Sequence, residues 1–377
     1  MNRFTTDVHH EQVGSLGLIT LNRPKALNAL SLDMVRELTD ILLRWQADNS
    51  VIAVAIRGSN KEGAFGAFCA GGDIRYFHQA ALAGDASLED FFTEEYALNH
   101  LIHSYGKPYI AFMDGIVMGG GMGLSQGAAL RIVTERTQMA MPETQIGLFP
   151  DVGGGYFLSR CKGAMGEYLA LSGQLLKGAE SLAVGLADVM CESSDLASLW
   201  QGMSQHSFAT GEAVLVWLRE QTLAATTSHQ TLPAWSNEHI HTVFTLPTVA
   251  QMVLALQTLA QQEGVDSWAA QTLATLRHKS PLMLNVTLQQ IRRGRSLSLA
   301  DDLRMERDLV RHCFHTAHLS RSGKTSETVE GIRALAVDKD RTPRWLPATI
   351  EEVTPEMVEP FFNSPWPAWA HPLGYLT

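Results

Sequence analysis

The chain has 377 residues, of which 45% are hydrophobic and 18% are charged, a balance typical of globular proteins rather than disordered ones. The net charge is -10 and no run of lysine or arginine stands out, which argues against nucleic acid and anionic membrane surfaces as partners. No apolar run reaches the length needed to span a membrane.

The cysteines and the N-terminal residues bear on the compartment. Cys69, Cys161, Cys191 and Cys313 are few for this length and lack the C-x-x-C spacing of redox or zinc sites, so we expect reduced thiols. Residues 1–7 contain no apolar or arginine-rich targeting segment, and we therefore expect a cytoplasmic location. Since no ligand cluster is evident, neither a metal nor a redox cofactor is expected.

Strands and helices alternate in the first half of the sequence. Residues 16–21 predict a strand that ends at Asn22-Arg23-Pro24, and Ser31 is the expected N-cap of an amphipathic helix. The continuous apolar run at 51–56 is typical of a strand buried on both faces. This succession indicates a parallel α/β fold. A further helix is expected from Ser87, with Asp90 completing a capping-box-like pair.

Two glycine-rich turns each follow a strand, one around Gly72 and the other around Gly120. Two convergent backbone N–H groups can form an oxyanion hole, and glycine lets a carbonyl approach the backbone. Ordinary tight turns are the structural alternative. Neither a dinucleotide-binding nor a P-loop glycine pattern is present. Of the neighbouring residues, Asp73 is expected to cap a helix and Cys69 to be a small buried hydrophobic residue.

The loop at residues 140–155 holds two carboxylates, Glu143 and Asp151, in apolar and glycine-rich surroundings. Each follows a proline, and the residue before a proline favours extended backbone, which indicates a punctuated loop. Carboxyl groups in apolar surroundings have raised pKa values and are candidates for function. The structural alternative is that one caps a helix and the other belongs to a turn.

Beyond about Cys191 the strand-like runs disappear and helical periodicity dominates. The predicted helices are 196–208, 212–223, 248–262, 268–279, 282–292 and 298–314. In the last of these, Ser298 with Asp301 again resembles a capping box. The tail from Ser364 is rich in proline and tryptophan and is expected to be irregular.

Several of these stretches together resemble the crotonase (enoyl-CoA hydratase/isomerase) superfamily. The matching stretches are Asn22–Leu30, Phe68–Ile74, Asp114-Gly115 with Met118–Gly121, and Met141-Pro142-Glu143. The resemblance implies an α/β fold with a crotonase-like ββα spiral core that binds acyl-CoA, followed by an all-helical region. The boundaries expected from it are 8–192 for the catalytic core, 193–362 for the helical region and 363–377 for the tail.

The hydratases of the superfamily carry a second glutamate three residues after the position of Gly120, where this chain has Gly123. The stretches 143–158 and 91–99, and the late Glu330–Leu335, Asp338–Asp340 and Trp345, instead resemble the 3-hydroxyisobutyryl-CoA hydrolase branch. The implied reaction is thioester hydrolysis in valine breakdown. The alternatives left open are an enoyl-CoA isomerase or hydratase, and a non-catalytic acyl-CoA-binding protein.

The resemblance also implies roles for individual residues. Gly72 and Gly120 would supply the oxyanion hole, Glu143 would act as nucleophile or general base, and Asp151 with Glu95 would bind the 3-hydroxyl group. The further substrate contacts implied are Lys25, Ala26, Leu27, Ala70, Asp73 and Ile74. Coenzyme A enters only as part of the substrate, so no separate cofactor is expected. Family members assemble variously, so monomer and homo-oligomer both stay open.

Overall fold

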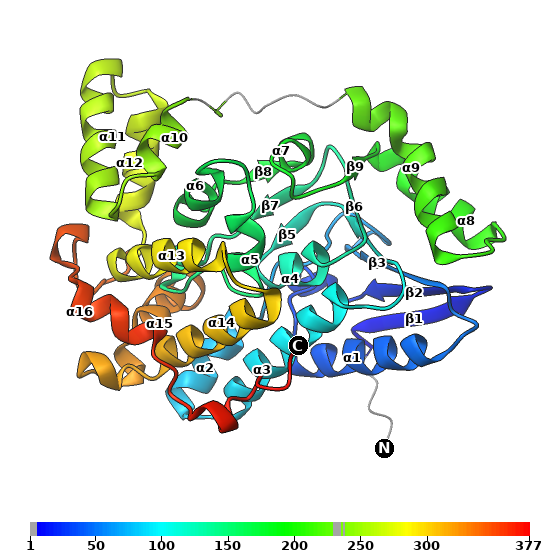
Figure 1. Ribbon diagram of the computed structural model, residues 1–377, viewed down its shortest axis with the longest axis horizontal. Coiled ribbons are helices and arrows are strands. Elements are labelled where there is room, and N and C mark those ends of the chain that lie inside the picture. The colour runs from blue at the N-terminus through cyan, green and yellow to red at the C-terminus, as the bar shows by residue number, and fades with distance from the viewer. Residues whose placement is uncertain (1–5, 229–234, 237) are drawn as a thin grey trace. The chain divides into compact units, whose positions relative to one another are not determined.

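The computed structural model describes residues 6–228, 235–236 and 238–377 (Figure 1). The chain forms two compact units that alternate along the sequence: unit 1 holds residues 1–72, 94–140 and 175–233, and unit 2 holds residues 73–93, 141–174 and 234–377. The consecutive ranges 8–192, 193–362 and 363–377 expected from the sequence therefore stay a prediction. No helix within the described ranges is both long and apolar enough to cross a membrane.

Unit 1 is built on a six-stranded sheet in the order β1-β2-β3-β4-β6-β9. Its strands are β1 Val8–Val13, β2 Leu16–Leu21, β3 Ala53–Gly58, β4 Tyr109–Met113, β6 Leu130–Val133 and β9 Val189–Met190. The first two form an antiparallel hairpin, and every other pair is parallel. The parallel α/β architecture expected from the sequence is confirmed, and β1 is a strand that the sequence pattern did not predict.

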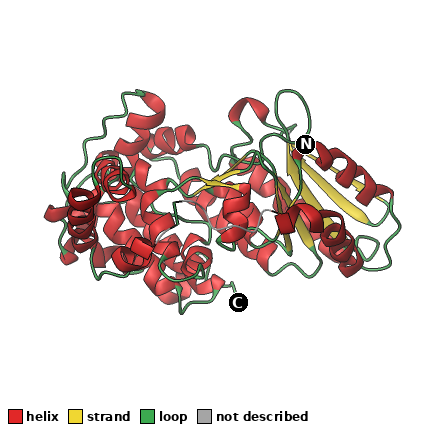
Figure 2. Cartoon of the chain, turned by 90° about the horizontal axis from the view of Figure 1, so that it is seen from above, coloured by secondary structure: helices red, strands yellow, loops and turns green. Residues whose placement is uncertain are grey.

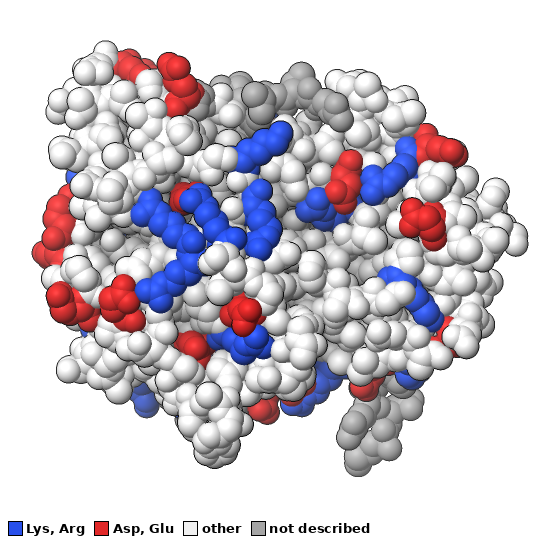
Figure 3. Space-filling model, viewed as in Figure 1, with Lys and Arg blue, Asp and Glu red and all other residues white. Residues whose placement is uncertain are grey.

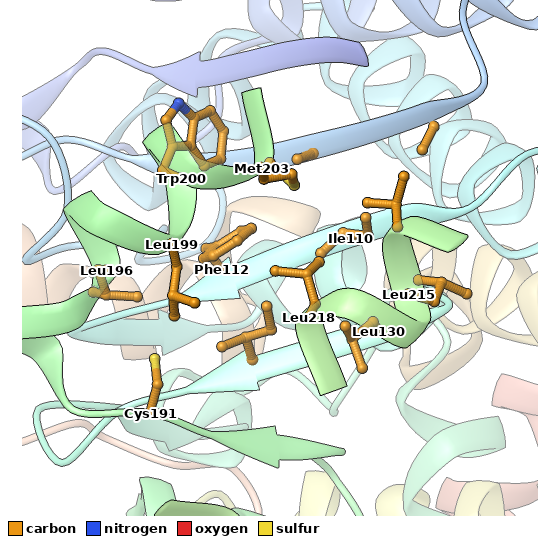
Figure 4. Close-up of a cluster of buried hydrophobic side chains, with 14 of the residues drawn as sticks. Ile110, Phe112, Leu130, Cys191, Leu196, Leu199, Trp200, Met203, Leu215 and Leu218 are labelled. Carbon is orange, nitrogen blue, oxygen red and sulfur yellow. The ribbon is translucent and has the colours of Figure 1, made fainter. Parts of the chain in front are cut away.

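Helices of unit 1 bury the faces of this sheet. They are α1 Leu32–Ala47, α4 Gly120–Gln126, α7 Gly178–Ala183, α8 Leu196–Gln205, α9 Gly211–Ser228 and the second half of α3 Ser87–His103. Figure 4 shows Leu199 and Trp200 of α8 and Leu218 of α9 directed at Phe112 and Leu130 of the sheet. The side chains of the helices and those of the sheet are almost fully buried at this contact. The removal of their apolar surface from water holds α8 and α9 against the sheet.

A second, three-stranded sheet, in the order β5-β7-β8, contains the strands β5 Ile116–Met118, β7 Gln138–Ala140 and β8 Leu176–Lys177. It matters because β5 leads directly into Gly119 and the start of α4. Cys69 pairs with Val117 of β5 in a parallel bridge, and Leu30 pairs with Gly72 in another. These bridges bring both glycine-rich turns to one place in unit 1.

The described residues of unit 2 form helices and no strand (helices are red in Figure 2). Its helices are α2 Ile74–Ala83, the start of α3, α5 Gly154–Ser159, α6 Met165–Ser172, α10 Glu238–Phe244, α11 Val249–Glu263, α12 Trp268–His278, α13 Pro281–Gly294, α14 Leu299–Phe314, α15 Glu327–Ile332, the π-helical turn Arg333–Val337 and α16 Pro355–Val358. Within this unit α13 packs against α5 and α6, and α15 packs against α2.

Helix starts confirm most of the predicted caps. The hydroxyls of Ser31 and Ser298 accept hydrogen bonds from Met34 N–H (3.3 Å) and Asp301 N–H (3.1 Å). The helix expected from Ser87 is confirmed, since α3 begins at that residue, and its capping-box-like pair with Asp90 stays a prediction. The carboxylate of Asp85 accepts from the Ser87 N–H at 2.9 Å.

Candidate active site

Unit 1 brings the glycine turns at Gly72 and Gly120 together. Gly71 has a φ of +100°, and a Cβ atom added to it would lie 3.2 Å from Met118 O and 3.5 Å from the Gly120 nitrogen. A Cβ added to Gly120 would lie 3.5 Å from the Gly71 carbonyl carbon, the atom bonded to the Gly72 nitrogen. These short distances show that the backbone at Gly71 and Gly72 lies against the backbone at Gly120, and the positive φ of Gly71 favours glycine there.

The N–H groups of both glycines are available to a ligand. Gly120 is the first residue of α4, and the first N–H groups of a helix have no partner within it. Among the described residues, none accepts a hydrogen bond from the Gly72 N–H. An oxyanion hole requires two such donors, and the structure brings the two turns that carry them together.

Glu95 lies against Gly120 in the same unit. Its Oε1 atom is 2.5 Å from the position that a Cβ atom on Gly120 would occupy, and the residue is only 2% exposed. The expected grouping of Glu95 with Gly120 is therefore seen within unit 1. Glycine at this position leaves the space that the carboxylate fills.

The Lys25-Ala26-Leu27 turn is joined to the first glycine turn by backbone hydrogen bonds. Ala70 N–H donates to Leu27 O at 3.0 Å, and Leu30 N–H donates to Gly71 O at 2.8 Å. Lys25 is exposed, and Leu27 is 43% exposed with a left-handed φ of 51°. The turn thus presents an exposed surface beside the oxyanion donors.

Asn28 is a structural residue of this turn whose role the sequence interpretation missed. It is fully buried, has a φ of 57°, and its amide Nδ2 donates to the backbone oxygens of Ser59 (2.8 Å), Ala67 (2.9 Å) and Phe68 (3.1 Å). Asparagine tolerates the left-handed region better than most residues. It therefore holds the segment before Gly72 in place.

Cys69 is a buried residue and not a nucleophile. It is fully inaccessible, and burial raises the pKa of its thiol to about 12. At neutral pH the reactive thiolate is therefore negligible. The expectation that Cys69 serves as a small hydrophobic residue is confirmed, and all four cysteines are buried free thiols.

Unit 2 contains the two carboxylates of the central loop. Glu143 begins a single 3-10 turn, Glu143–Ile146, which ends at Gly147 in the left-handed conformation. The side chains of Glu143 and Asp151 are 7% and 6% exposed. Burial, and secondly the negative charge of Asp151, raise the pKa of Glu143 well above its ordinary value.

Glu143 has one unpartnered carboxyl oxygen and a nearby positive charge. Its Oε2 atom is buried and has no hydrogen-bond partner among the described residues. Lys279, itself 6% exposed, carries the positive charge that lowers the pKa of Glu143 against the burial effect. Burial lowers the pKa of Lys279 to about 8, and the charge of Glu143 opposes that shift.

The loop that contains Asp151 is held by hydrogen bonds to side chains of α13 and α14, which lie much later in the sequence. The Glu306 carboxylate accepts from Gly153 N–H (2.8 Å) and Gly155 N–H (2.9 Å), and Asp302 accepts from Tyr156 N–H (2.8 Å). Gln290 donates to Pro150 O at 2.6 Å and to Glu306 at 3.0 Å. All three supporting side chains are buried.

These supporting residues were missed by the sequence interpretation. The one available signal was two acids one turn apart on the same face of a predicted helix, Asp302 and Glu306, a spacing that is also common on exposed helix surfaces. Burial raises the pKa of Asp302 to about 7, and burial together with the charge of Asp302 raises that of Glu306 well above its ordinary value. The pair is therefore partly protonated at neutral pH.

Asp73 and Ile74 open helix α2 in unit 2. The Asp73 side chain accepts from Tyr76 N–H at 3.3 Å, which confirms the expected capping role.

No group of three or more His, Cys, Asp or Glu residues in the described part of the chain is placed to hold a metal ion.

Comparison with known proteins decides the family. A sequence model of the enoyl-CoA hydratase/isomerase family matches residues 16–362. The chain belongs to the enoyl-CoA hydratase/isomerase family. The crotonase resemblance drawn from the glycine turns and the Met141-Pro142-Glu143 segment is thereby confirmed.

Curated relatives match nearly the whole of this chain. The 3-hydroxyisobutyryl-CoA hydrolase of Gallus gallus is 39% identical over 95% of this chain and 89% of its own. Those of Xenopus laevis and Homo sapiens are 41% and 39% identical, each over 94% of this chain and 88% of their own. All three names carry the word mitochondrial.

Two solved structures share the fold over nearly the whole chain. A carnitinyl-CoA dehydratase from Mycobacterium thermoresistibile matches with a TM-score of 0.79 and 36% identity, covering 95% of this chain and 97% of its own. An enoyl-CoA hydratase from Rhodobacter sphaeroides 2.4.1 matches with a TM-score of 0.78 and 34% identity, covering 96% and 98%. The expected fold class, a crotonase-like α/β core with a C-terminal helical region, is confirmed.

Proposed function

We propose that this chain hydrolyses the thioester of a 3-hydroxyacyl-CoA, with 3-hydroxyisobutyryl-CoA as the preferred substrate and valine breakdown as the pathway. The identity of 39–41% to hydrolases of that name, over more than nine-tenths of this chain, supports the reaction class. The observation that carries the proposal is the buried Glu143 carboxyl group, with its unpartnered Oε2 atom and with Asp151 and Lys279 acting on its charge.

The proposed reaction assigns one task to each group. The thioester oxygen accepts hydrogen bonds from the N–H groups of Gly72 and Gly120, which stabilise the negative charge that develops on it. Glu143 either attacks the carbonyl carbon to form a mixed anhydride, which water then hydrolyses, or activates the water directly. The thiol of coenzyme A has a pKa near ~8.5 and leaves with little help from an acid.

Substrate selection is assigned to the two other carboxylates. We propose that Asp151 and Glu95 accept the hydrogen bond of the 3-hydroxyl group. A substrate without that hydroxyl would leave a buried polar group unmatched, which is costly and therefore selective. The exposed Lys25-Ala26-Leu27 turn, with Ala70 beside it, is assigned to the coenzyme A moiety.

A hydratase or isomerase of the same family is the second candidate. The solved structures titled dehydratase and hydratase favour it through their likeness over nearly the whole chain. Hydration of a double bond uses two carboxylates around one water, yet residue 123, where the hydratases of the superfamily have the second one, is glycine in this chain. We therefore rank hydrolysis first. An isomerase needs only one carboxylate base, so Glu143 alone would suffice for it.

The compartment, cofactor requirement and assembly are also proposals. Four buried free thiols support a reducing compartment, for which we propose the cytoplasm, although the curated relatives are named mitochondrial. We propose that no metal or separate cofactor is needed, because the proposed groups complete the reaction. Full activity after EDTA treatment would support the absence of a metal requirement.

Size-exclusion chromatography with light scattering would decide between monomer and homo-oligomer.

The proposal is tested by incubating the protein separately with 3-hydroxyisobutyryl-CoA and crotonyl-CoA in the presence of a thiol reagent. Thiol release from the first substrate supports hydrolysis. Loss of the enoyl absorbance of the second, without thiol release, would instead establish a hydratase. Tight binding of both without turnover would leave only an acyl-CoA-binding role. The Glu143→Gln variant, measured in parallel, controls for a contaminating thioesterase.

A further inference from the structure

Unit 2 contains a cavity to which the proposed reaction assigns no part of the substrate. Its volume is about 370 Å³, within the usual range of ligand pockets. Its walls come from the turn that carries Glu143, through Gln145, from the end of α12, through His278 and Lys279, and from the segment 331–343, including Leu335 and Arg341. These are three segments widely separated in the sequence.

Three basic side chains line this cavity, and none of them has a partner for its charged group among the described residues. Lys279 is 6% exposed, yet its ammonium group makes no hydrogen bond and no ion pair with any described group. Arg341 and His278 are exposed and are likewise unpaired within the described ranges. The ammonium nitrogen of Lys279 is not among the buried side-chain atoms that lack a hydrogen-bond partner, so it is accessible and open to a ligand in the cavity.

The position of Arg341 is fixed by its backbone conformation and by a backbone hydrogen bond. Its φ is 57°, in the left-handed region, and its N–H donates to Ala334 O at 3.0 Å. The preceding residues, 333–337, form a π-helical turn, a rare element that is frequent at functional sites. The chain therefore departs twice from regular geometry in the segment that carries Leu335 and Arg341 to the cavity.

Two arginines in the last turn of α13, Arg292 and Arg293, differ from the cavity residues because they have partners. Figure 3 shows lysine and arginine side chains gathered on one face. Arg292 donates to Pro247 O at 2.7 Å, and Arg293 forms an ion pair with Glu359 at 3.0 Å. These arginines are used in holding the fold together. The cavity residues His278, Lys279 and Arg341 are not.

The surroundings limit the charge of a ligand. Glu143 acts electrostatically on Lys279 from one side. Arg333 is already held by three acids, Glu330 (2.8 Å), Asp338 (2.7 Å) and Asp340 (2.7 Å), so its charge is not available to a ligand. Because the charge of Glu143 offsets part of that of Lys279, the positive charge that remains for a ligand suits an anion with one charge better than a phosphate dianion. Leu335 and the neighbouring Ala334 and Pro343 supply apolar wall, which suits an organic anion.

We propose that this cavity is a binding site for a small organic monocarboxylate, held by the ammonium of Lys279 and the guanidinium of Arg341. Its occupation has a consequence for Glu143, because the positive charge of Lys279 favours the ionised form of that carboxyl group. An anion beside Lys279 offsets this charge and slows turnover. Where the anion is the released hydroxy acid, the site provides product feedback, a step that rests on the proposed function.

Binding is measured by isothermal titration calorimetry on the full chain without acyl-CoA, at fixed ionic strength. The probes are 3-hydroxyisobutyrate, isobutyrate and inorganic phosphate. Arg341→Gln should weaken binding of the carboxylates by about tenfold or more, as expected for one charged hydrogen bond. His278→Gln, at a second exposed position, should weaken it as well. Both variants should keep the basal rate and the melting temperature.

Arg277→Gln is the charge-matched control, because Arg277 lies one residue from His278 and is paired with Glu351 at 3.5 Å. It should change carboxylate binding by less than about twofold. Equal weakening by all three variants would mean diffuse attraction and would overturn the proposal, as would the absence of binding by every probe. Tighter binding of phosphate than of either acid would overturn the monocarboxylate assignment.

The two acids distinguish the source of the ligand. Tighter binding of 3-hydroxyisobutyrate than of isobutyrate supports the product as ligand, and equal binding supports a general carboxylate site. Because no acyl-CoA is present, failure of the hydrolase assignment would leave this result standing. In turnover assays the acid should inhibit without competing with acyl-CoA. Inhibition that Arg341→Gln leaves unchanged would overturn the feedback step.

Discussion

The carboxylate of Glu306 accepts a hydrogen bond of 2.8 Å from the backbone N–H of Gly153, although 153 residues separate the two in the chain. The same carboxylate accepts a second hydrogen bond, of 2.9 Å, from the N–H of Gly155, and together the two bonds hold the turn after Asp151 in place. Val152 and Gly153 in that turn have left-handed φ values of 56° and 88°. The buried carboxylate stabilises a backbone conformation that the local sequence alone holds weakly.

Glu306→Gln should therefore affect both stability and activity. The amide keeps the size of the side chain but presents an NH₂ group where a carboxylate oxygen accepted a hydrogen bond. We expect a loss of about 1–3 kcal/mol in the free energy of unfolding, measured by urea denaturation. Hydrolysis should fall as Asp151 is displaced. Glu220→Gln, on the exposed side of α9, is the control and should leave both unchanged.

Glu143→Gln should abolish most hydrolysis and leave acyl-CoA binding intact. The substitution is nearly isosteric and removes the base or nucleophile, and thiol release with 3-hydroxyisobutyryl-CoA is the measurement. Circular dichroism and the melting temperature check the fold. Turnover within about tenfold of the parent would remove Glu143 from its catalytic role, since loss of such a group typically costs 10²–10⁴-fold.

The pH dependence of turnover should report the raised pKa of Glu143. Glu143 acts when ionised, so the rate should fall as the pH falls through that raised pKa. Asp151→Asn removes a charge that raises the pKa and should move the acid limb of kcat/KM to lower pH. Lys279→Met removes a charge that lowers it and should move the limb to higher pH. Shifts in the same direction would contradict this electrostatic assignment.

Gly120 and Gly121 form a matched pair of tests for the oxyanion turn. A Cβ atom on Gly120 would meet the movable Glu95 Oε1 at 2.5 Å, whereas one on Gly121 would collide with the backbone oxygen of Cys69. Gly120→Ala should therefore lower kcat at a nearly unchanged melting temperature. Gly121→Ala should mainly lower the melting temperature. If the temperature falls in step with kcat for Gly120→Ala, the glycine is structural.

Asp151→Asn should also change the selectivity between substrates with and without a 3-hydroxyl group. Asparagine keeps the size and one acceptor oxygen but loses the charge-assisted hydrogen bond, worth ~1.5–3 kcal/mol. The ratio of kcat/KM for 3-hydroxyisobutyryl-CoA and isobutyryl-CoA should shift by about ten- to a hundredfold. Equal losses on both substrates would mean that Asp151 acts at the thioester or only supports the loop.

The local elements and the candidate residues for chemistry can be predicted from the amino-acid sequence. Hydrophobic periodicity and N-cap residues such as Ser31 and Ser298 act within a few residues, so they can be read along the chain. The glycines at 72 and 120 and the carboxylates at 143 and 151 were found in the same way, because their residue types are unusual where they stand. The crotonase resemblance then assigned roles to them.

The contacts that hold these residues in place and the charges that shift their pKa values depend on the tertiary structure. The contact of Glu95 with Gly120 depends on the packing of α3 against the start of α4, and the support of the Asp151 loop depends on α13 and α14. Lys279 acts on Glu143 only because α12 ends beside the 3-10 turn. Burial, charge coupling and hydrogen bonds between distant segments are properties of three-dimensional proximity, which sequence spacing does not encode.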